Sequence, residues 1–223
     1  RRNGLTLLRL VDQMLDLARV EAGALPVEKK RGNIIPYLHY LTESFHSHAG
    51  SKNIGLFFDS ELEEFELDFD PDKLRTVIVN LLSNALKFTP TGGEVRLMVG
   101  EAEAGPGGAG KAHLSIRVQD NGPGIAAADL PHIFDHFYQS ENTVRKEQGG
   151  AGIGLALTRE LVRLMGGEIS VESVPGEGAT FSLLLPVTRE APLFDTEEWT
   201  RRSYEKAPET GAPAEKEAAS EPA

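Results

Sequence analysis

The chain has 223 residues, of which 40% are hydrophobic, so it can form one domain with appendages or two small domains. Its formal net charge of −11 argues against a broad basic surface for nucleic acid, because phosphate binding needs clustered Lys and Arg. The lack of cysteine excludes disulfides, thiolate zinc sites and cysteine nucleophiles. No apolar run reaches the roughly 18 residues needed to span a bilayer, and no signal peptide is visible.

Residues 4–25 predict one helix with an apolar stripe. Its apolar residues recur at intervals of seven, in the pairs Leu7 and Met14, Leu10 and Leu17, and Val11 and Ala18. Such a stripe is typical of a helical bundle, and it equally fits an amphipathic helix packed on its own domain. Because the chain begins without Met and inside this helix, we expect a fragment of a longer protein, whose membrane attachment would lie outside it.

Residues 24–33 (ALPVEKKRGN) interrupt this pattern with proline and glycine, which makes them a candidate domain junction. Residues 36–49 predict a helix, with proline in its first turn and Gly50 as its C-terminal cap. Residues 54–60 and 65–69 predict two strands.

Asp70 followed by Pro71 predicts the start of a helix that runs to about Phe88. One face of this helix is apolar and is expected in the core: Leu74, Val77, Ile78, Leu81, Leu82 and Ala85. A separate polar stripe follows spacings of four and three, and its members are Asn80, Asn84 and Lys87. Amide oxygens suit Mg²⁺ and an ammonium suits phosphate, so this stripe fits a magnesium–phosphate site; it also fits a solvated polar face.

Residues 94–100 and 113–119 alternate apolar and polar side chains, as half-buried strands do. The second strand leads into Asp120, Gly122 and Gly124 (DNGPG). A carboxylate at a strand end can accept a hydrogen bond from an exocyclic amine, and the glycines let the backbone approach a ligand. An ordinary turn has the same composition.

A glycine cluster, with Gly150, Gly152 and Gly154, precedes a helix predicted over residues 151–165. The N–H groups at a helix N-terminus bind phosphate well. This is not a P-loop, because no Gly-Lys-Ser/Thr follows, and no strand directly precedes it as in a Rossmann motif. Before this cluster, Phe134 and Phe137 predict a short packed helix.

Residues 139–148 are polar and contain Arg145, which suits a mobile lid over a phosphate ligand. The chain then continues with two strands, 168–173 and 179–186, joined by a glycine turn. Residues 191–223 hold eight acidic and four basic residues and four prolines, which predicts a disordered acidic linker. Phe194 and Trp199 are expected to dock the start of this linker on the domain. The predicted fold is α+β: a two-layer α/β sandwich of a mixed, mostly antiparallel sheet with helices on one face, preceded by a bundle-forming helix.

The motifs occur in a specific order: Asn-x-x-x-Asn-x-x-Lys, Asp-x-Gly-x-Gly, Phe-x-x-Phe, Gly-x-Gly-x-Gly and Gly-x-Gly-x-Thr. This order resembles the ATP-binding catalytic domain of sensor histidine kinases, within the gyrase, Hsp90, histidine kinase and MutL class of ATPases. The segments NLLSNALKFTP, DNGPGI, IFDHFYQ, GGAGIGLAL and GEGATFSLLLP stand close to the family's N, G1, F, G2 and G3 boxes. The resemblance covers roughly residues 33–187.

The resemblance implies ATP and Mg²⁺ as ligands and a role for each matching residue. Asn84 would be the principal Mg²⁺ ligand, with Asn80 nearby or contributing. Asn80, Lys87 and Arg145 form the implied catalytic set, in which Lys87 and Arg145 contact phosphates. Asp120 would accept the adenine amine. The implied nucleotide-binding residues are Asn84, Asp120, Gly122, Gly124, Gly150, Gly152, Gly154 and Thr180.

The resemblance also predicts three parts. Residues 1–30 would hold part of the second helix of a dimerisation hairpin and a junction, 31–190 the ATP-binding domain, and 191–223 the linker. The family's phosphoaccepting histidine belongs to the first hairpin helix, before an Arg-Thr-Pro-like stretch. None of the six histidines here has that context, so we expect the acceptor outside this chain.

The implied partners are a second copy of the intact protein through the hairpin and a response regulator or receiver domain, with no direct nucleic-acid partner. The acidic linker suggests a hybrid kinase. The implied location is cytoplasmic, with an inner-membrane anchor in the full-length protein as one option.

Hydrolytic relatives of the gyrase and MutL kind carry a glutamate base four residues before the magnesium-binding asparagine. Asn80 occupies that position here, and an amide cannot take a proton from water at neutral pH. The sequence therefore favours phosphoryl transfer over hydrolysis. The alternatives are an ATP hydrolase of this class, an anti-sigma serine kinase and a nucleotide-binding module without transfer activity.

Overall fold

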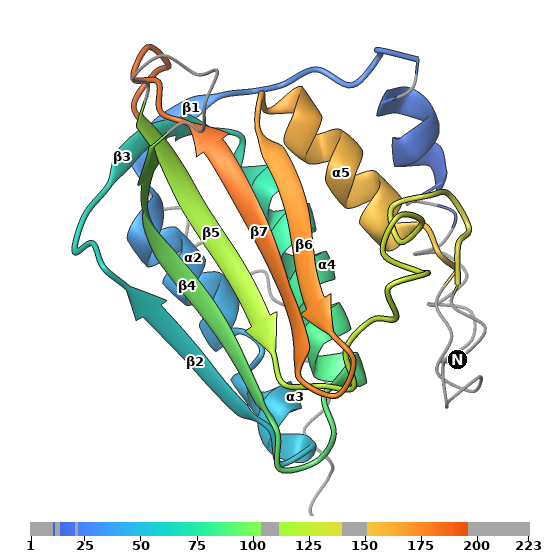
Figure 1. The fold of residues 1–223 in the computed structure, drawn as a ribbon. Helices are drawn as coiled ribbons and strands as arrows, with labels where there is room; N and C mark the ends of the chain where they lie inside the picture. The colour runs from blue at the N-terminus through green and yellow to red at the C-terminus, as the bar shows by residue number, and fades with distance from the viewer. Residues whose placement is uncertain (1–10, 12–13, 21, 104–111, 140–150, 196–223) are drawn as a thin grey trace, which may run out of the picture.

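The main sheet contains five strands in the order β2-β4-β5-β7-β6 (Figure 1). The computed structural model describes residues 11, 14–20, 22–103, 112–139 and 151–195. The strands are β2 (Gly55–Ser60), β4 (Glu94–Glu103), β5 (Ala112–Asp120), β6 (Glu168–Val174) and β7 (Gly178–Pro186). β2 runs parallel to β4, and the other neighbouring pairs are antiparallel. The sheet is therefore mixed and mostly antiparallel, as predicted.

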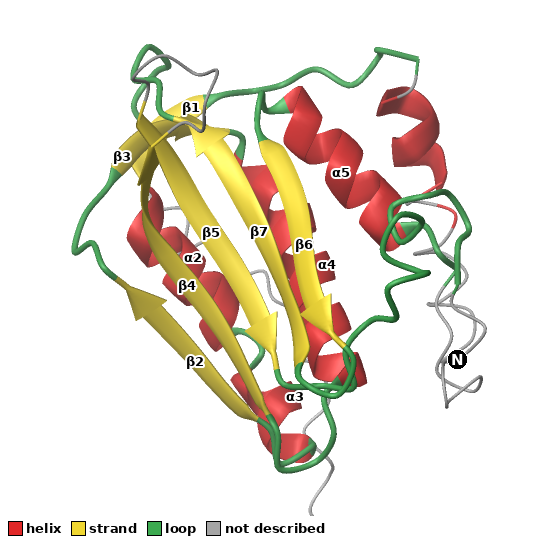
Figure 2. Ribbon diagram, in the orientation of Figure 1, coloured by secondary structure: helices red, strands yellow, loops and turns green. Residues whose placement is uncertain are grey.

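The helices lie on one face of this sheet (Figure 2). They are α2 (Ile34–Glu43), α3 (His46–Ser51), α4 (Pro71–Phe88) and α5 (Gly154–Leu164). Alternate strand residues turn toward the helices and are buried: Val95, Leu97, Val99, Leu114, Ile116, Val118, Phe181, Leu183 and Leu185. The two-layer α+β sandwich predicted from the period-2 and period-3.6 patterns is confirmed.

α4 has the bounds that its sequence signals predict. The Asp70 side chain caps the helix by accepting a hydrogen bond from the Lys73 N–H, and Pro71 occupies the first turn. All six residues of the predicted apolar face are at most 5% exposed: Leu74, Val77, Ile78, Leu81, Leu82 and Ala85. Because that face is fixed in the core, the polar stripe of α4 has a fixed direction as well.

The helix predicted over 36–49 is wrong in its bounds, because two helices replace it. Asn33 caps α2 by accepting the Ile35 N–H at 3.2 Å, so helical structure begins at Ile34. The chain then breaks at Ser44 and Phe45, where the Ser44 hydroxyl donates to the Leu41 carbonyl at 2.6 Å. Gly50 lies inside α3 and is not a cap.

The predicted junction contains a strand that sequence periodicity does not reveal. β1 (Lys30–Asn33) pairs antiparallel with β3 (Glu66–Phe69) in a separate two-stranded sheet. The residues after β7 pair with β1 at the edge of this small sheet, since the Arg31 N–H donates to the Pro192 carbonyl and the Phe194 N–H to the Arg31 carbonyl. We call residues 187–195 the exit segment.

The buried acid Asp68 holds the exit segment. Asp68 is 6% exposed, and its carboxylate accepts the backbone N–H groups of Glu190 at 2.7 Å and Ala191 at 3.1 Å. Phe194 packs edge-on against Phe69, as its predicted docking requires. Trp199 and residues 196–223 lie outside the described residues.

The N-terminal helix is described for residue 11 and residues 14–20, on the α5 side of the molecule (Figure 1). Leu17 and Val20 are 6% and 8% exposed and join the core, whereas Met14 and Leu15 are about half exposed at 49% and 50%. The helix thus packs on the domain and also presents an apolar face outward. Within the described part of the chain, no helix combines the length and apolar character that a bilayer crossing needs.

Candidate nucleotide-binding site

The polar stripe of α4 meets the first turn of α5. The Asn80 Nδ2 group donates to the Gly154 carbonyl at 3.4 Å and to the Thr158 hydroxyl at 3.5 Å. The Thr158 hydroxyl itself donates to the Gly154 carbonyl at 2.8 Å and is fully buried. Two motifs 74 residues apart in sequence therefore form one wall.

The N-terminus of α5 suits an anion. Ile153 occupies the N-cap position, and its aliphatic side chain cannot accept a hydrogen bond from the first-turn N–H groups. The first turn contains no acidic residue. These N–H groups and the helix dipole together favour a phosphate beside Asn80.

Asp120 ends β5 in an apolar setting. Burial raises the pKa of its carboxyl, and backbone hydrogen bonds from Gly122 and Ala179 partly offset this effect. The residue is 8% exposed, and its Oδ1 accepts the Gly122 N–H at 2.9 Å. A buried carboxylate has strong demand for further donors, so an exocyclic amine is a suitable ligand for it.

Two glycines permit close backbone contacts around this site. A Cβ on Gly178 would lie 1.9 Å from the Asp120 carbonyl oxygen, and Gly178 has φ +98°. A Cβ on Gly152 would lie 2.6 Å from the Phe137 carbonyl carbon, and Gly152 has φ +71°. Side chains at either position would push apart the segments that shape the site.

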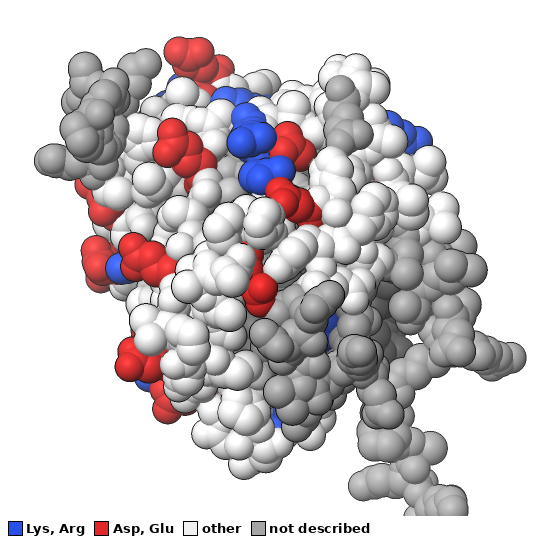
Figure 3. All heavy atoms as spheres, turned by 45° about the vertical axis from the view of Figure 1, so that its right-hand side comes forward, with Lys and Arg blue, Asp and Glu red and all other residues white. Residues whose placement is uncertain are grey.

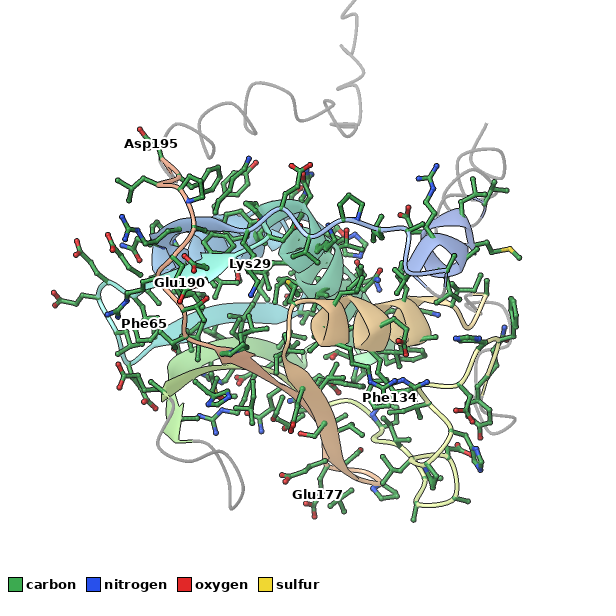
Figure 4. The ribbon with its side chains drawn as sticks, turned by 90° about the horizontal axis from the view of Figure 1, so that it is seen from above. Lys29, Phe65, Phe134, Glu177, Glu190 and Asp195 are labelled. Atoms are coloured by element: carbon green, nitrogen blue, oxygen red, sulfur yellow. The ribbon has the colours of Figure 1, made fainter. Side chains whose placement is uncertain are left out.

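The short helix predicted around Phe134 and Phe137 is wrong, because residues 127–137 form successive turns and bends. Phe134 does pack, because its ring lies edge-on to Phe181 of β7 and against the Arg159 guanidinium of α5. Figure 4 shows Phe134 near α5. Phe137 is 58% exposed and has φ +61°, a conformation that a helix does not contain. Its N–H donates to the Gly152 carbonyl at 2.9 Å, which ties this turn region to the start of α5.

Lys87 lies near the C-terminal end of α4, half-buried. Burial lowers the pKa of its ammonium, and the nearby charge of Lys52 lowers it further. A phosphate would compensate both effects, because an anion restores the preference for the charged form. Asn84 is half-buried on the same stripe, one turn before Lys87.

Phe88 was missed by the sequence analysis. Its ring is 41% exposed at the end of α4, and a Cβ on Gly122 would lie 3.3 Å from its carbonyl oxygen. The Phe88 backbone therefore lies beside the Asp120 loop, and the Lys87 ammonium lies 4.7 Å from the centroid of the Phe88 ring. An exposed aromatic ring offers a flat apolar surface for a base. The signal available in the sequence was an aromatic residue directly after Lys87, outside the apolar face of the helix.

Thr180 is not brought to Asp120. In the pairing of β5 with β7, Ala179 stands opposite Asp120, and Thr180 stands opposite Gln119. Because successive strand residues point to opposite faces, Thr180 lies on the face away from the Asp120 side chain. Arg145 and Gly150, with the predicted lid over 139–148, fall outside the described residues except for Gln139.

The donor set fits the predicted Mg²⁺ through the amide oxygens of Asn80 and Asn84. Such hard oxygen ligands suit Mg²⁺, which is commonly shared with substrate phosphates. Among the residues that the structure describes, no group of three or more histidine and acidic side chains could hold a metal. On the face of the molecule shown in Figure 3, basic and acidic side chains are interspersed, with no broad basic surface.

Comparison with known proteins identifies the family of this chain. Residues 69–189 match the family model described as histidine kinase-, DNA gyrase B-, and HSP90-like ATPase. The chain is 34% identical over 187 residues to hybrid signal transduction histidine kinase D of Dictyostelium discoideum, and the alignment covers 84% of this chain and 12% of the relative. It is 36% identical over 190 residues to sensor protein GacS of Pseudomonas syringae pv. syringae, and that alignment covers 82% of this chain and 20% of the relative.

Solved structures give the same result. Full-length ShkA in complex with AMPPNP has a TM-score of 0.73 and 30% identity, covering 86% of this chain and 38% of that one. The nucleotide-free catalytic domain of histidine kinase ThkA has a TM-score of 0.61 at 21% identity, a likeness of fold. The chain spans a fifth or less of the length of the two curated relatives. The chain belongs to the histidine kinase-, DNA gyrase B- and HSP90-like ATPase family, as a catalytic domain of the sensor histidine kinase type.

Proposed function

We propose that this chain binds ATP with Mg²⁺ between α4, the end of β5 and the start of α5. The contact of Asn80 with Gly154 and Thr158 carries this proposal, because it joins an amide-rich helix face to a helix N-terminus. The triphosphate would lie at that junction, near Asn84 and Lys87. The adenine amine would donate to Asp120, and the base would lie against Phe88.

In the intact protein, we infer transfer of the γ-phosphoryl group to a histidine nitrogen. The bond from the γ-phosphorus to the bridging oxygen breaks, a phosphorus–nitrogen bond forms, and ADP leaves. When bound, Mg²⁺ supplies neutralisation of phosphate charge, with Asn84 and Asn80 as the ligands that would hold it. The chain itself supplies orientation through Lys87 and the α5 N–H groups.

Asn80 supports transfer over hydrolysis. Its amide donates to α5 and cannot act as a base toward water at neutral pH. Arg145 remains a proposed γ-phosphate contact. The proposed partners are a second copy through the hairpin and a response regulator or receiver domain, and the proposed division of the chain is 1–30, 31–190 and 191–223.

Phosphotransfer is tested by mixing this chain with the helical hairpin of the parent protein and γ-labelled ATP. The proposal predicts acid-labile label on the hairpin, absent when its histidine is replaced. An N84A variant should abolish this label. Release of inorganic phosphate from ATP without any labelled protein would instead identify a hydrolase.

A further inference from the structure

Ser173 of β6 links two segments that border the base-binding end of the site. Its hydroxyl donates to the Gly178 carbonyl at 2.6 Å and accepts the Ile125 N–H at 2.8 Å. Gly178 begins β7, and Ile125 lies in the loop that follows Asp120. One hydroxyl therefore uses both its donor and its acceptor capacity to join the β6–β7 hairpin to the loop 121–125.

Backbone contacts also join the loop 121–125 to the β6–β7 hairpin, and we call this contact region the seam. The Gly176 N–H donates to the Pro123 carbonyl at 2.8 Å. A Cβ on Gly124 would lie 2.2 Å from the Val174 carbonyl oxygen, so loop and hairpin are in direct contact. Ser173 stands at the centre of this seam and adds a side chain that is half-buried there. Figure 4 shows Glu177 at the outer end of the hairpin, away from the helices.

The loop in turn fixes the orientation of the Asp120 carboxylate. Asp120 Oδ1 accepts the Gly122 N–H at 2.9 Å, and Gly122 lies three residues before the Ile125 N–H that Ser173 holds. A loop that shifts would carry the Gly122 N–H with it and leave a buried carboxylate with one donor fewer. The direction of the remaining lone pairs of Asp120 would then change.

We propose that Ser173 is a positioning residue for the base-binding end of the nucleotide site. It acts through Ile125, the loop and Gly122 on the orientation of Asp120. This inference rests on the proposed function, since it assumes that Asp120 receives the base. The effect belongs to the base end of the site, whereas the phosphates would lie at the α4–α5 junction.

Ser173→Ala should weaken the binding of ATP, ADP and adenosine by the same factor, about tenfold, because both hydrogen bonds of the hydroxyl, which order the base end, are lost. Ser173→Thr keeps the hydroxyl and should restore affinities near those of the wild type. Lys87→Met is the comparison for the phosphate contact, and it should weaken the binding of ATP by a larger factor than the binding of adenosine. Ser170→Ala, on the exposed side of the same strand, is the matched control and should bind like the wild type.

The test is calorimetric titration of each variant with the three ligands, together with thermal melts. An equal loss for all three ligands in Ser173→Ala, with rescue by threonine, supports the inference. A lower melting temperature with unchanged affinities would overturn it and assign Ser173 a purely structural role. If Ser173→Ala does not fold, Ser173→Cys decides by the same criterion, since a thiol hydrogen-bonds weakly. Wild-type protein that binds none of the ligands would refute the proposed function itself.

Discussion

Asp120 shows at the scale of one residue how a binding site opposes stability. Burial raises the pKa of its carboxyl, so the folded protein holds this proton more tightly than the unfolded chain. The free energy of unfolding therefore falls as pH rises through the folded-state pKa. At neutral pH the ionised carboxylate costs stability, and a ligand amine would relieve that cost.

Asp120→Asn should therefore separate binding from stability. We expect ATP binding to fall at least tenfold, because the amide presents a weaker acceptor to the adenine amine. We expect the melting temperature at pH 7 to stay the same or to rise, because no charge remains to be buried. Titration with ATP and melts between pH 4 and pH 8 check both results. A large drop in melting temperature with intact binding would contradict this role for Asp120.

At the scale of elements, the start of α5 depends on contact with the turn region at Phe137 and Tyr138. Gly152 is the point of contact, and a Cβ there would lie within 3 Å of backbone atoms of both residues. Gly92 has a similar φ of +84°, yet a Cβ there meets nothing within 4 Å. Alanine variants at these two positions therefore distinguish the effect of backbone strain from the effect of steric displacement.

Gly152→Ala should weaken ATP binding and lower stability by more than Gly92→Ala does. Both variants carry the cost of a positive φ, about 1 kcal/mol, and only Gly152→Ala also forces backbone atoms apart. Chemical denaturation and ATP titration of the two variants provide the comparison. Equal effects of the two variants on stability and binding would show that the contact at Phe137 does not position α5.

The same scale shows what sequence signals can predict. Asp70 and Pro71 predict the start of α4 because a cap is a local interaction between residues three apart. The pairing of β1 with β3, and the position of Ala179 opposite Asp120, depend on contacts between residues 33 or more positions apart in the sequence. Local periodicity does not report such pairings, which is why Thr180 was assigned to the site and Phe88 and Ser173 were not.

At the scale of the whole molecule, two acids at the end of β3 and the start of α4 hold both ends of the folded domain. Asp70 accepts the Glu28 N–H at 2.8 Å and so holds the segment that follows the N-terminal helix. Asp68, two residues earlier, holds the exit segment. Burial opposes ionisation of Asp68, but hydrogen bonds from Glu190, Thr188 and Ala191, with the charge of Lys29, keep its pKa below the ordinary value.

Asp68→Asn should lower the stability of the domain by about 1–3 kcal/mol, because two backbone N–H groups lose a charged acceptor. The sign of the pH dependence follows from the lowered pKa: the wild-type contribution is present above the unfolded-state pKa and is lost as pH falls through the folded-state pKa. The difference between the two proteins should therefore shrink in acid. Denaturation at pH 7 and pH 3 measures this difference in the free energy of unfolding. A difference that grows in acid would contradict the role of Asp68 in holding the exit segment.

The central claim is that α4, Asp120 and α5 form one ATP site. Calorimetric titration of the chain with ATP, with and without Mg²⁺, tests it most directly in wild-type and Asn84→Ala proteins. We predict that the wild type binds ATP saturably and one to one, and that Mg²⁺ strengthens this binding. Asn84→Ala should weaken the binding of ATP with Mg²⁺ at least tenfold, and adenosine should bind equally well to both proteins. An affinity for ATP that neither Mg²⁺ nor the loss of Asn84 changes would contradict the account.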